Sequence, residues 1–577
     1  MVERHAGSEG CGYVREHGRG RGRRLLRGGR LSLVWGAVFA VMVGAVGIGG
    51  AGAAGAAGSV GDTGSVGAVP AASVAPAASV GEVGEVGSAD QVGVGPVPGP
   101  PAGAGSRIAW RPCEQDASAE CGALSVPVNW AEPGGERFDL QLARRTATDP
   151  GARVGSMVFG PGGPGDSGVE RIVGKGNMAR FSDRLRSRFD IVSFDPRGVG
   201  LSNPVRCSQR LLDRRPPTVI KDQAAFDATV RYNRELRADC RKNTAHGLFD
   251  HADTLSMVKD LDAIRAALGE RTLTFHGSSY GTLLGEQYAE QYPERIRALV
   301  LEAVVDHSLG TREFLTTQAA TLQDSFDEFV AWCDRSEDCA LHGSDVRALW
   351  TDLLAGAERG DLSEGGTTLA PFDLNVLVMK RLYDPEWRRL AEFLHGLSED
   401  GSGSKGTRTA GDTGPSAAAS TGPSKPASTG AEPSLGSNPF EIFCQDWRLP
   451  VRDYQDYARE LRRVARTAPD MRYPRALMSV SACLGAPQPD NPQHRLKVRN
   501  TRPLLLTNSI HDPAAGYSWA TSVARQLGRH AVLHTYEGWG HGTYSSSPCA
   551  QRTVDDYLIE AKVPARGASC PAVEPTG

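Results

Sequence analysis

Gly277-Ser278-Ser279-Tyr280-Gly281 is the stretch of sequence that decides the fold. It fits the G-x-S-x-G nucleophile elbow, in which a serine stands on a tight turn between a strand and a helix. The pattern alone is weak evidence, because the chain contains 69 glycines and a chance match would be unremarkable. Its surroundings strengthen it: residues 271–275 and 296–301 are typical of strands, and 283–292 of a helix that ends before a proline. We therefore predict that Ser279 is a nucleophile.

Two candidate partners for this serine follow it in the chain. A serine hydroxyl needs a base that a third group orients, and with this elbow the order is serine, acid, histidine. Asp512 comes after the apolar run Leu504-Leu505-Leu506, a predicted buried strand, and His541 lies in a glycine-flanked loop after a predicted strand at 532–536. We predict that Asp512 and His541 complete a catalytic triad. The alternative for Asp512 is that it only caps a helix starting near Ala514.

A glycine-rich loop, Gly160-Pro161-Gly162-Gly163-Pro164-Gly165, follows a predicted strand at 156–159. Glycines at this place let backbone N–H groups reach a tetrahedral oxyanion with no side chain in the way. We assign one donor to Gly163, with Gly162 as the alternative, and the other to Tyr280, directly after the predicted nucleophile. A Gly-Pro loop by itself is typical of an ordinary turn, and its position after a strand favours the substrate-binding interpretation.

Predicted strands alternate with helical patterns along the chain. The segment 254–268 carries its aliphatic residues on one stripe, with Asp253 or Thr254 as the cap. Such alternation predicts an α/β fold with a mostly parallel sheet covered on both faces, and catalytic loops at the carboxyl ends of its strands. The strands are expected at 138–144, 156–159, 191–194, 273–275, 297–301, 504–507 and 532–536.

The stretch between the strands at 297–301 and 504–507 is far longer than one crossover helix needs. Its amphipathic segments, such as 314–332 and 372–394, predict a helical cap over the active site. A cap of this kind excludes water and limits which substrates enter.

Four motifs together resemble one family. They are the PGGPG loop, the segment from Asp195 to Ser202, the SYGT elbow and the GWGHG sequence around His541. They are similar to the secreted tripeptidyl aminopeptidases of actinobacteria, relatives of the proline iminopeptidases, and the match covers about residues 107 to 575. The resemblance implies an α/β-hydrolase fold with a helical cap inserted before the last strands, and an exopeptidase activity. This chain departs from the family at Gly160-Pro161, where Asn or His is usual, and at Ser278, where glycine is usual.

The termini and linkers have compositions of their own. Residues 1–57 are typical of a signal peptide, with an arginine-rich start, an uncharged apolar stretch and then small residues. An uncleaved membrane anchor is the alternative, because the apolar stretch approaches spanning length. Residues 58–105 lack aromatic residues and are predicted to be a disordered linker. The hydrolase core is expected at 106–307 and 496–577, and the cap at 308–495 with a disordered insertion at 401–439.

Composition limits the partners and the compartment. The net charge of −3 and the absence of a basic stripe argue against nucleic acid, and no CxxC pair or HExxH motif suggests a metal, so no cofactor is expected. Of the 11 cysteines, all but Cys11 follow the predicted signal, and an even number in an exported chain favours disulfides. Other pairings stay open, but sequential neighbours are the simplest: Cys113–Cys121, Cys207–Cys240, Cys333–Cys339, Cys444–Cys483 and Cys549–Cys570.

These patterns lead us to expect a secreted serine exopeptidase that releases short peptides from free N-termini through an acyl-enzyme. A membrane is expected as a partner only if the signal segment is uncleaved. The substrate's ammonium would need a carboxylate; the candidates, each of which can equally be an ordinary ion-pair or helix-end residue, are Glu302, Asp306, Glu441 and Asp446. The alternatives are a secreted carboxylesterase or lipase with the same triad, and a non-catalytic surface binding protein.

Overall fold

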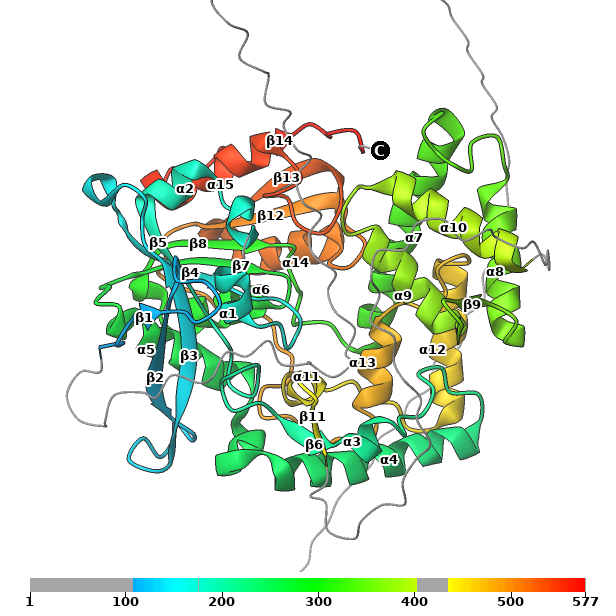
Figure 1. Cartoon of the computed structure of the whole chain (residues 1–577), viewed down its shortest axis with the longest axis horizontal. Helices are drawn as coiled ribbons and strands as arrows, with labels where there is room; N and C mark the ends of the chain where they lie inside the picture. Colours follow the sequence, from blue (N-terminus) through cyan, green and yellow to red (C-terminus); the bar gives the residue numbers. More distant parts are fainter. Residues whose placement is uncertain (1–106, 175, 402–433, 576–577) are drawn as a thin grey trace, which may run out of the picture. The chain divides into compact units, whose positions relative to one another are not determined.

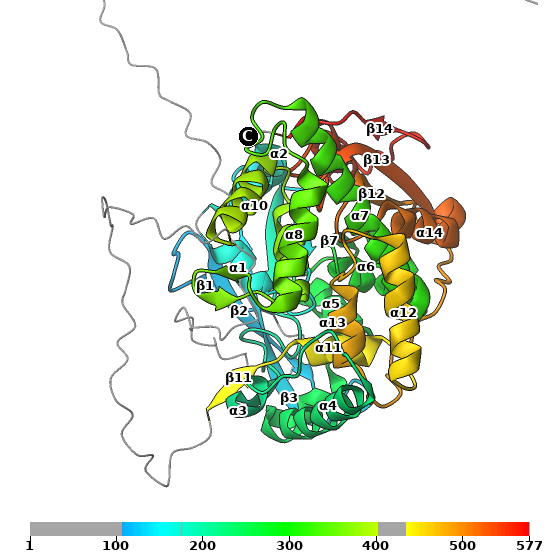
Figure 2. The ribbon, with the colours of Figure 1, turned by 90° about the vertical axis from the view of Figure 1, so that its right-hand side faces the viewer.

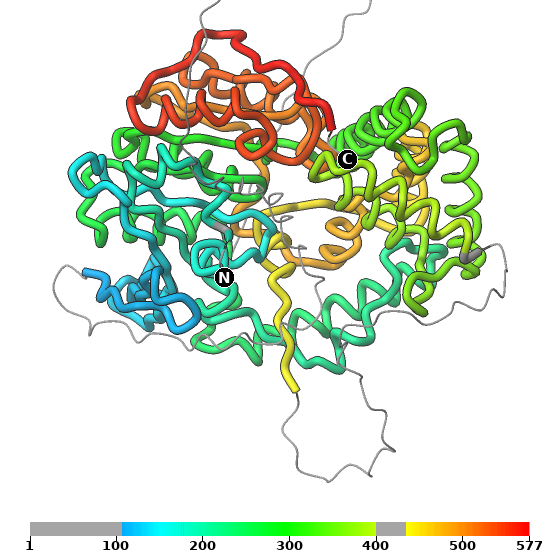
Figure 3. The backbone as a smooth tube through the Cα atoms, turned by 45° about the horizontal axis from the view of Figure 1, so that its top comes forward, coloured from blue at the N-terminus to red at the C-terminus, as the bar shows by residue number. Residues whose placement is uncertain are grey.

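The computed structural model describes residues 107–174, 176–401 and 434–575. The predicted signal peptide (1–57), the predicted linker (58–105) and most of the predicted insertion (401–439) therefore lie outside the described residues. The end of that insertion is ordered, contrary to the prediction, because β11 (Leu435–Ser437) pairs with β6 (Arg206–Ser208). Figure 3 shows this strand, in yellow, where the chain re-enters the described part. Among the described helices, none has the length and hydropathy that crossing a bilayer requires.

A ten-stranded sheet is the centre of the molecule. From β5 to β14 its strands are parallel, and β1, β2 and β3 add an antiparallel edge. The predicted mostly parallel α/β sheet is confirmed, and each predicted strand is present, whereas β1, β2 and β14 were not predicted. In spatial order the strands are β1 (Arg111–Pro112), β2 (Glu120–Pro127), β3 (Arg137–Arg145), β5 (Phe189–Phe194), β4 (Gly155–Gly160), β7 (Leu273–Ser278), β8 (Ile296–Glu302), β12 (Leu504–His511), β13 (Ala531–Trp539) and β14 (Ser569–Cys570).

Helices cover both faces of this sheet, as the buried parallel strands require. Alternate residues of one strand enter different cores: Met157 and Phe159 pack on one face of β4, and Val158 packs on the other. The helices of the first face are α1 (Gly168–Val173), α2 (Asp183–Arg188) and α15 (Pro548–Glu560). Those of the second are α5 (Thr254–Ala267), α6 (Gly281–Gln291) and α14 (Tyr517–Leu527). The prediction for α5 is confirmed, with Asp253 as its cap.

A helical cap lies between β8 and β12 in the chain, and Figures 1 and 2 show its helices grouped together. The predicted segment 372–394 is divided in two, because Pro385 lacks an N–H and cannot continue the helix. The cap elements are α7 (Thr311–Arg335), α8 (Val346–Arg359), β9 (Ser363–Glu364), β10 (Thr367–Thr368), α9 (Pro371–Arg381), α10 (Trp387–Gly401), β11, α11 (Phe440–Asp446), α12 (Tyr454–Thr467) and α13 (Ala476–Ala482). Elsewhere lie α3 (Gln209–Leu212), α4 (Gln223–Asn243), η1 (Pro150–Ala152), η2 (Asn177–Arg180), η3 (Ala245–His251), η4 (Pro293–Arg295) and η5 (Gly528–His530).

All five predicted disulfides are present, with Cα–Cα distances between 4.3 and 5.8 Å. The Cys444–Cys483 bond joins α11 to the residue that follows α13. These two helices are thus held together independently of their side-chain packing.

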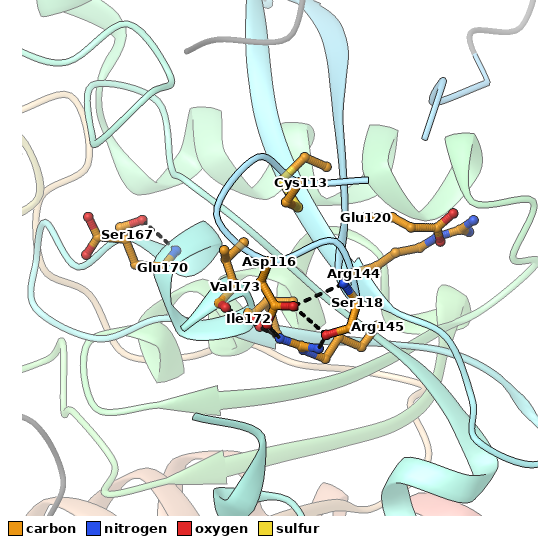
Figure 4. The surroundings of a disulfide bond; sticks show 11 residues. Cys113, Asp116, Ser118, Glu120, Arg144, Arg145, Ser167, Glu170, Ile172 and Val173 are labelled. Carbon is orange, nitrogen blue, oxygen red and sulfur yellow. Dashed lines mark hydrogen bonds and ion pairs between the residues drawn. A yellow bond between two sulfur atoms is a disulfide. The ribbon is translucent and has the colours of Figure 1, made fainter. Parts of the chain in front are cut away.

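The antiparallel edge is fastened to α1, the helix that follows the glycine-rich loop. Arg145 of β3 donates to the Ile172 carbonyl of α1 at 3.0 Å and pairs with Asp116. Figure 4 shows these contacts beside the Cys113–Cys121 disulfide. The edge therefore holds the C-terminal end of α1.

Candidate active site

The elbow has the strand–turn–helix form that its sequence predicts. Strand β7 ends at Ser278 and helix α6 begins at Gly281. Between them Ser279 has a φ of 53°, in the left-handed region that non-glycine residues rarely adopt. Gly281 permits the close approach of the neighbouring loop, since a Cβ there would lie 2.4 Å from the Gly160 carbonyl oxygen. A strained serine on a sharp turn of this kind is a common feature of functional sites.

The glycine-rich loop lies against this serine. Pairing of β4 with β7 sets Gly160 opposite Gly277 and so brings the following loop to the elbow. A Cβ on Gly162 would lie 3.2 Å from the Ser279 Cβ, and Gly163 lines the same cavity as Ser279 and Tyr280. Tyr280 occupies the N-cap of α6, where the first N–H groups have no acceptor inside the helix. The structure thus places both predicted oxyanion donors at the cavity that the serine lines, and Gly162, the alternative donor, lies against the serine.

Asp512 and His541 lie side by side after neighbouring strands. The Asp512 carboxylate accepts from His541 Nδ1 at 2.9 and 3.0 Å. It also accepts from the backbone N–H groups of Ala514 and Ala515, so the helix-start role considered for Asp512 coexists with the histidine contact. When its Nδ1–H donates this hydrogen bond to Asp512, the neutral His541 presents an unprotonated Nε2 that can take a proton. Burial lowers the pKa of His541, but the Asp512 charge outweighs it and the pKa is raised.

The backbone around His541 is held by Glu302, at the end of β8. The Glu302 carboxylate accepts from the N–H groups of Thr543 and Tyr544, both at 2.7 Å. Its other oxygen lies 2.9 Å from His276 Nε2, and its backbone carbonyl accepts from the N–H of Ser279 at 2.9 Å. Burial raises the pKa of Glu302, but the interactions with His276 and the two amides outweigh burial and lower the pKa to about 2. One residue therefore contacts both the elbow and the histidine loop.

Tyr383 contacts His541 from the cap. It lies in the break between α9 and α10, and its carbonyl accepts from the His541 N–H at 2.8 Å. Its ring packs on the imidazole with centroids 4.6 Å apart. Sequence reasoning missed this residue, although the proline that ends α9 is a visible signal of a break.

A cavity opens beside Ser279 between the sheet edge and the cap. Its walls are mostly apolar, with many aromatic side chains, and its one charged lining residue within the described chain is Arg475, which the sequence did not single out. The lining residues are Gly163, Pro164, Ser279, Tyr280, Val305, Phe314, Gln318, Tyr383, Phe440, Phe443, Trp447, Arg475, Ser479, Ala514, Ala515 and Trp519.

Each of the four candidate carboxylates has partners inside the protein. Besides Glu302, Asp306 accepts from Ser308 and Gln526, and Glu441 pairs with Arg237 at 3.1 Å. Asp446 accepts from the Tyr280 hydroxyl at 2.7 Å and from Thr254, and burial raises its pKa to about 6. No carboxylate lines the cavity among the described residues, and those residues include no His, Cys, Asp and Glu group able to hold a metal.

Comparison with known proteins gives matches over most of the chain. A family described as "alpha/beta hydrolase fold" matches residues 155–383, and one described as "TAP-like protein" matches 470–570. Serine protease Hip1 of Mycobacterium tuberculosis is 31% identical over 492 residues, which cover 81% of this chain and 91% of that protein. Tripeptidyl aminopeptidase of Streptomyces lividans is 28% identical, covering 80% and 86%. Carboxylesterase B of M. tuberculosis is 29% identical, covering 84% and 93%.

Proposed function

This chain belongs to the TAP-like family of α/β-hydrolases and is a serine hydrolase, and we propose that it is a secreted exopeptidase releasing short peptides, tripeptides in particular, from free N-termini. The observation that supports this most is the Asp512–His541 pair at the carboxyl edge of the sheet that also carries the Ser279 elbow. Similarity to a serine protease and to a tripeptidyl aminopeptidase supports the choice of a peptide bond.

In this proposal His541 Nε2 removes the proton from the Ser279 hydroxyl as its oxygen attacks the scissile carbonyl carbon. Asp512 orients the imidazole and stabilises the imidazolium that forms. The backbone amides of Gly163 and Tyr280 stabilise the oxyanion. The tetrahedral intermediate collapses, the C–N bond breaks, and the imidazolium gives its proton to the leaving amine. Water, deprotonated by His541, then hydrolyses the acyl-enzyme and restores the serine. The reaction requires no metal or cofactor, so activity in excess EDTA should be unchanged.

The proposed compartment is the outside of the cell. Five disulfides support an oxidising environment. The leader-like residues 1–57 support secretion, with anchoring at the cell surface as the alternative. The isolated exported protein should begin beyond Leu31 and contain no free thiols; an intact Met1 N-terminus would contradict cleavage of a signal peptide.

A carboxylesterase is the second candidate, because two observations favour it. The cavity beside Ser279 is largely apolar and no carboxylate that could meet an ammonium lines it within the described residues. One relative carries the name carboxylesterase B. The same proposed triad would cleave an ester, with an alcohol as the leaving group.

Four substrates separate these candidates. An alanyl tripeptide p-nitroanilide with a free N-terminus should be cleaved, its N-acetylated form much more slowly, and casein should show no internal cuts. Equal cleavage of the free and acetylated anilides would refute the exopeptidase. Turnover of p-nitrophenyl butyrate with neither anilide cleaved would establish the esterase instead.

A further inference from the structure

Arg475 is a cation without a carboxylate partner in the cavity beside Ser279. It stands at the N-cap of α13 and is half-buried. Arg472, three residues earlier, pairs with Glu358 at 3.1 Å, whereas Arg475 forms no ion pair with any described residue. The Arg475 guanidinium interacts with the hydroxyl of Tyr383. A guanidinium facing a mostly apolar cavity is a strong site for an anion, because its electrostatic interactions are screened less there than in bulk water.

Two further hydrogen-bond donors line the cavity with this arginine. Ser479 follows Arg475 by four residues, so the two side chains lie on the same face of α13 and both line the cavity. Gln318 of α7 is oriented by the Ala476 N–H, which donates to its Oε1. Its Nε2 amide group is therefore the part of Gln318 able to donate into the cavity.

We propose that Arg475, Ser479 and Gln318 form a binding site for a carboxylate group of the substrate, next to the bond that Ser279 attacks. Arginine matches a carboxylate with two parallel hydrogen bonds, and the hydroxyl and amide supply the remaining donors. The inference rests on the proposed role of Ser279, and it holds for either a peptide or an ester substrate.

The carboxylate can come from two sources. It is either an acidic side chain on the acyl part of the substrate, or the terminal α-carboxylate of a short peptide. A purely structural Arg475, which only holds Tyr383 against His541, would instead affect all substrates equally.

Two esters of similar shape test the site without assuming a peptidase. p-Nitrophenyl succinate carries a free carboxylate, and p-nitrophenyl butyrate replaces that end with a methyl group. The wild-type enzyme should prefer the succinate in kcat/KM. Arg475→Gln should reduce the succinate/butyrate ratio by about 10- to 100-fold, the usual effect of losing a hydrogen bond to a charged group. Arg475→Lys should keep part of the preference.

Two matched variants distinguish a binding role of Arg475 from a purely structural one. Arg472→Gln removes a guanidinium whose partner is outside the cavity, and its ratio should equal that of the wild type. Tyr383→Phe removes the hydroxyl that contacts Arg475, so it should change kcat for both esters and leave the ratio nearly unchanged. Fluorophosphonate labelling of Ser279 in each variant shows that the site is folded. Glutarate, which carries carboxylates, should protect Ser279 from labelling, and the neutral butyramide should not. This pair tests carboxylate binding without measuring turnover.

Two pairs of peptide substrates identify which carboxylate the site binds. Ala-Ala-Glu against Ala-Ala-Gln p-nitroanilide tests the acidic side chain, and a tetrapeptide against its C-terminal amide tests the α-carboxylate. A ratio lost in Arg475→Gln for either pair supports the site and names its source. The proposal is overturned if Arg475→Gln leaves the succinate/butyrate ratio and the glutarate protection at wild-type values, or if it slows both esters by the same factor.

Discussion

Replacing Glu302 with glutamine removes the charge that contacts both the elbow and the histidine loop. Glutamine resembles the protonated form of the glutamate, so the pKa shift of Glu302 gives the size of the effect. The pKa falls from 4.5 to about 2, and each unit is worth about 1.4 kcal/mol, so the ionised form stabilises the fold by about 3 kcal/mol. We expect Glu302→Gln to reduce the free energy of unfolding at pH 7 by this amount.

The pH dependence of this loss has a definite sign. A depressed carboxyl pKa gives stability that is complete above the unfolded value of 4.5 and is lost as the pH falls through about 2. The difference between wild type and Glu302→Gln should therefore shrink from about 3 kcal/mol at pH 7 to about 1 kcal/mol at pH 3. Urea unfolding followed by tryptophan fluorescence at several pH values measures it.

The same substitution should alter catalysis. Thr543 and Tyr544 would lose their charged acceptor, so the His541 loop becomes less fixed and kcat/KM should fall by about tenfold or more. Glu560→Gln is the control, because its partner Arg184 is at the surface and that pair is worth about 1 kcal/mol or less. If Glu302→Gln has the wild-type free energy of unfolding at pH 7 and the wild-type kcat/KM, the reasoning is refuted.

Four further predictions concern the triad and the disulfides. Ser279→Ala should abolish fluorophosphonate labelling and nearly all turnover, and full activity in that variant would remove Ser279 from the mechanism. Because the pKa of His541 is raised above 6.5 and the base must be neutral, the acid limb of the kcat/KM profile should have its midpoint above pH 6.5. Asp512→Asn should move this limb to lower pH and reduce kcat by about 10^4, as in other triads, and an unmoved limb would argue against the contact. Replacing Cys444 and Cys483 by alanine should destabilise the protein by about 4 kcal/mol, against about 2 kcal/mol for Cys333 and Cys339, because the loops closed span 39 and 6 residues; equal losses in calorimetry would contradict this.

Much of the core could be predicted because local pattern and fold agree there. Apolar runs such as Leu504-Leu505-Leu506 are continuous because both faces of a parallel strand are buried. The glycines of the elbow indicate a tight turn in the local sequence itself. The order of the triad residues then followed from the motif. Strand β2 was missed because it lies at the antiparallel edge and its sequence, ECGALSVP, mixes small and polar residues.

The walls of the cavity could not be predicted, because they depend on contacts between distant parts of the cap. Arg475 looks like any surface arginine until α13 and α7 are placed together, and nothing near it in sequence marks it. Glu302 was considered as a ligand for an ammonium, but its two loop amides come from residues about 240 positions later. Such long-range pairing leaves no local signal in one sequence.

Strands β8 and β12 are neighbours in the sheet although the whole cap separates them in the chain. Val300 stands beside Leu505, and just beyond β8 Ala303 donates to the Thr507 carbonyl at 3.1 Å, so β12 holds β8 in place up to the point where the chain leaves the sheet for the cap. The cap is thus a segment that can be exchanged between two strands of fixed position. Its helices can be lengthened, shortened or replaced over evolution without moving β8 or β12, so the range of substrates can change while the chemistry at the sheet edge is inherited intact.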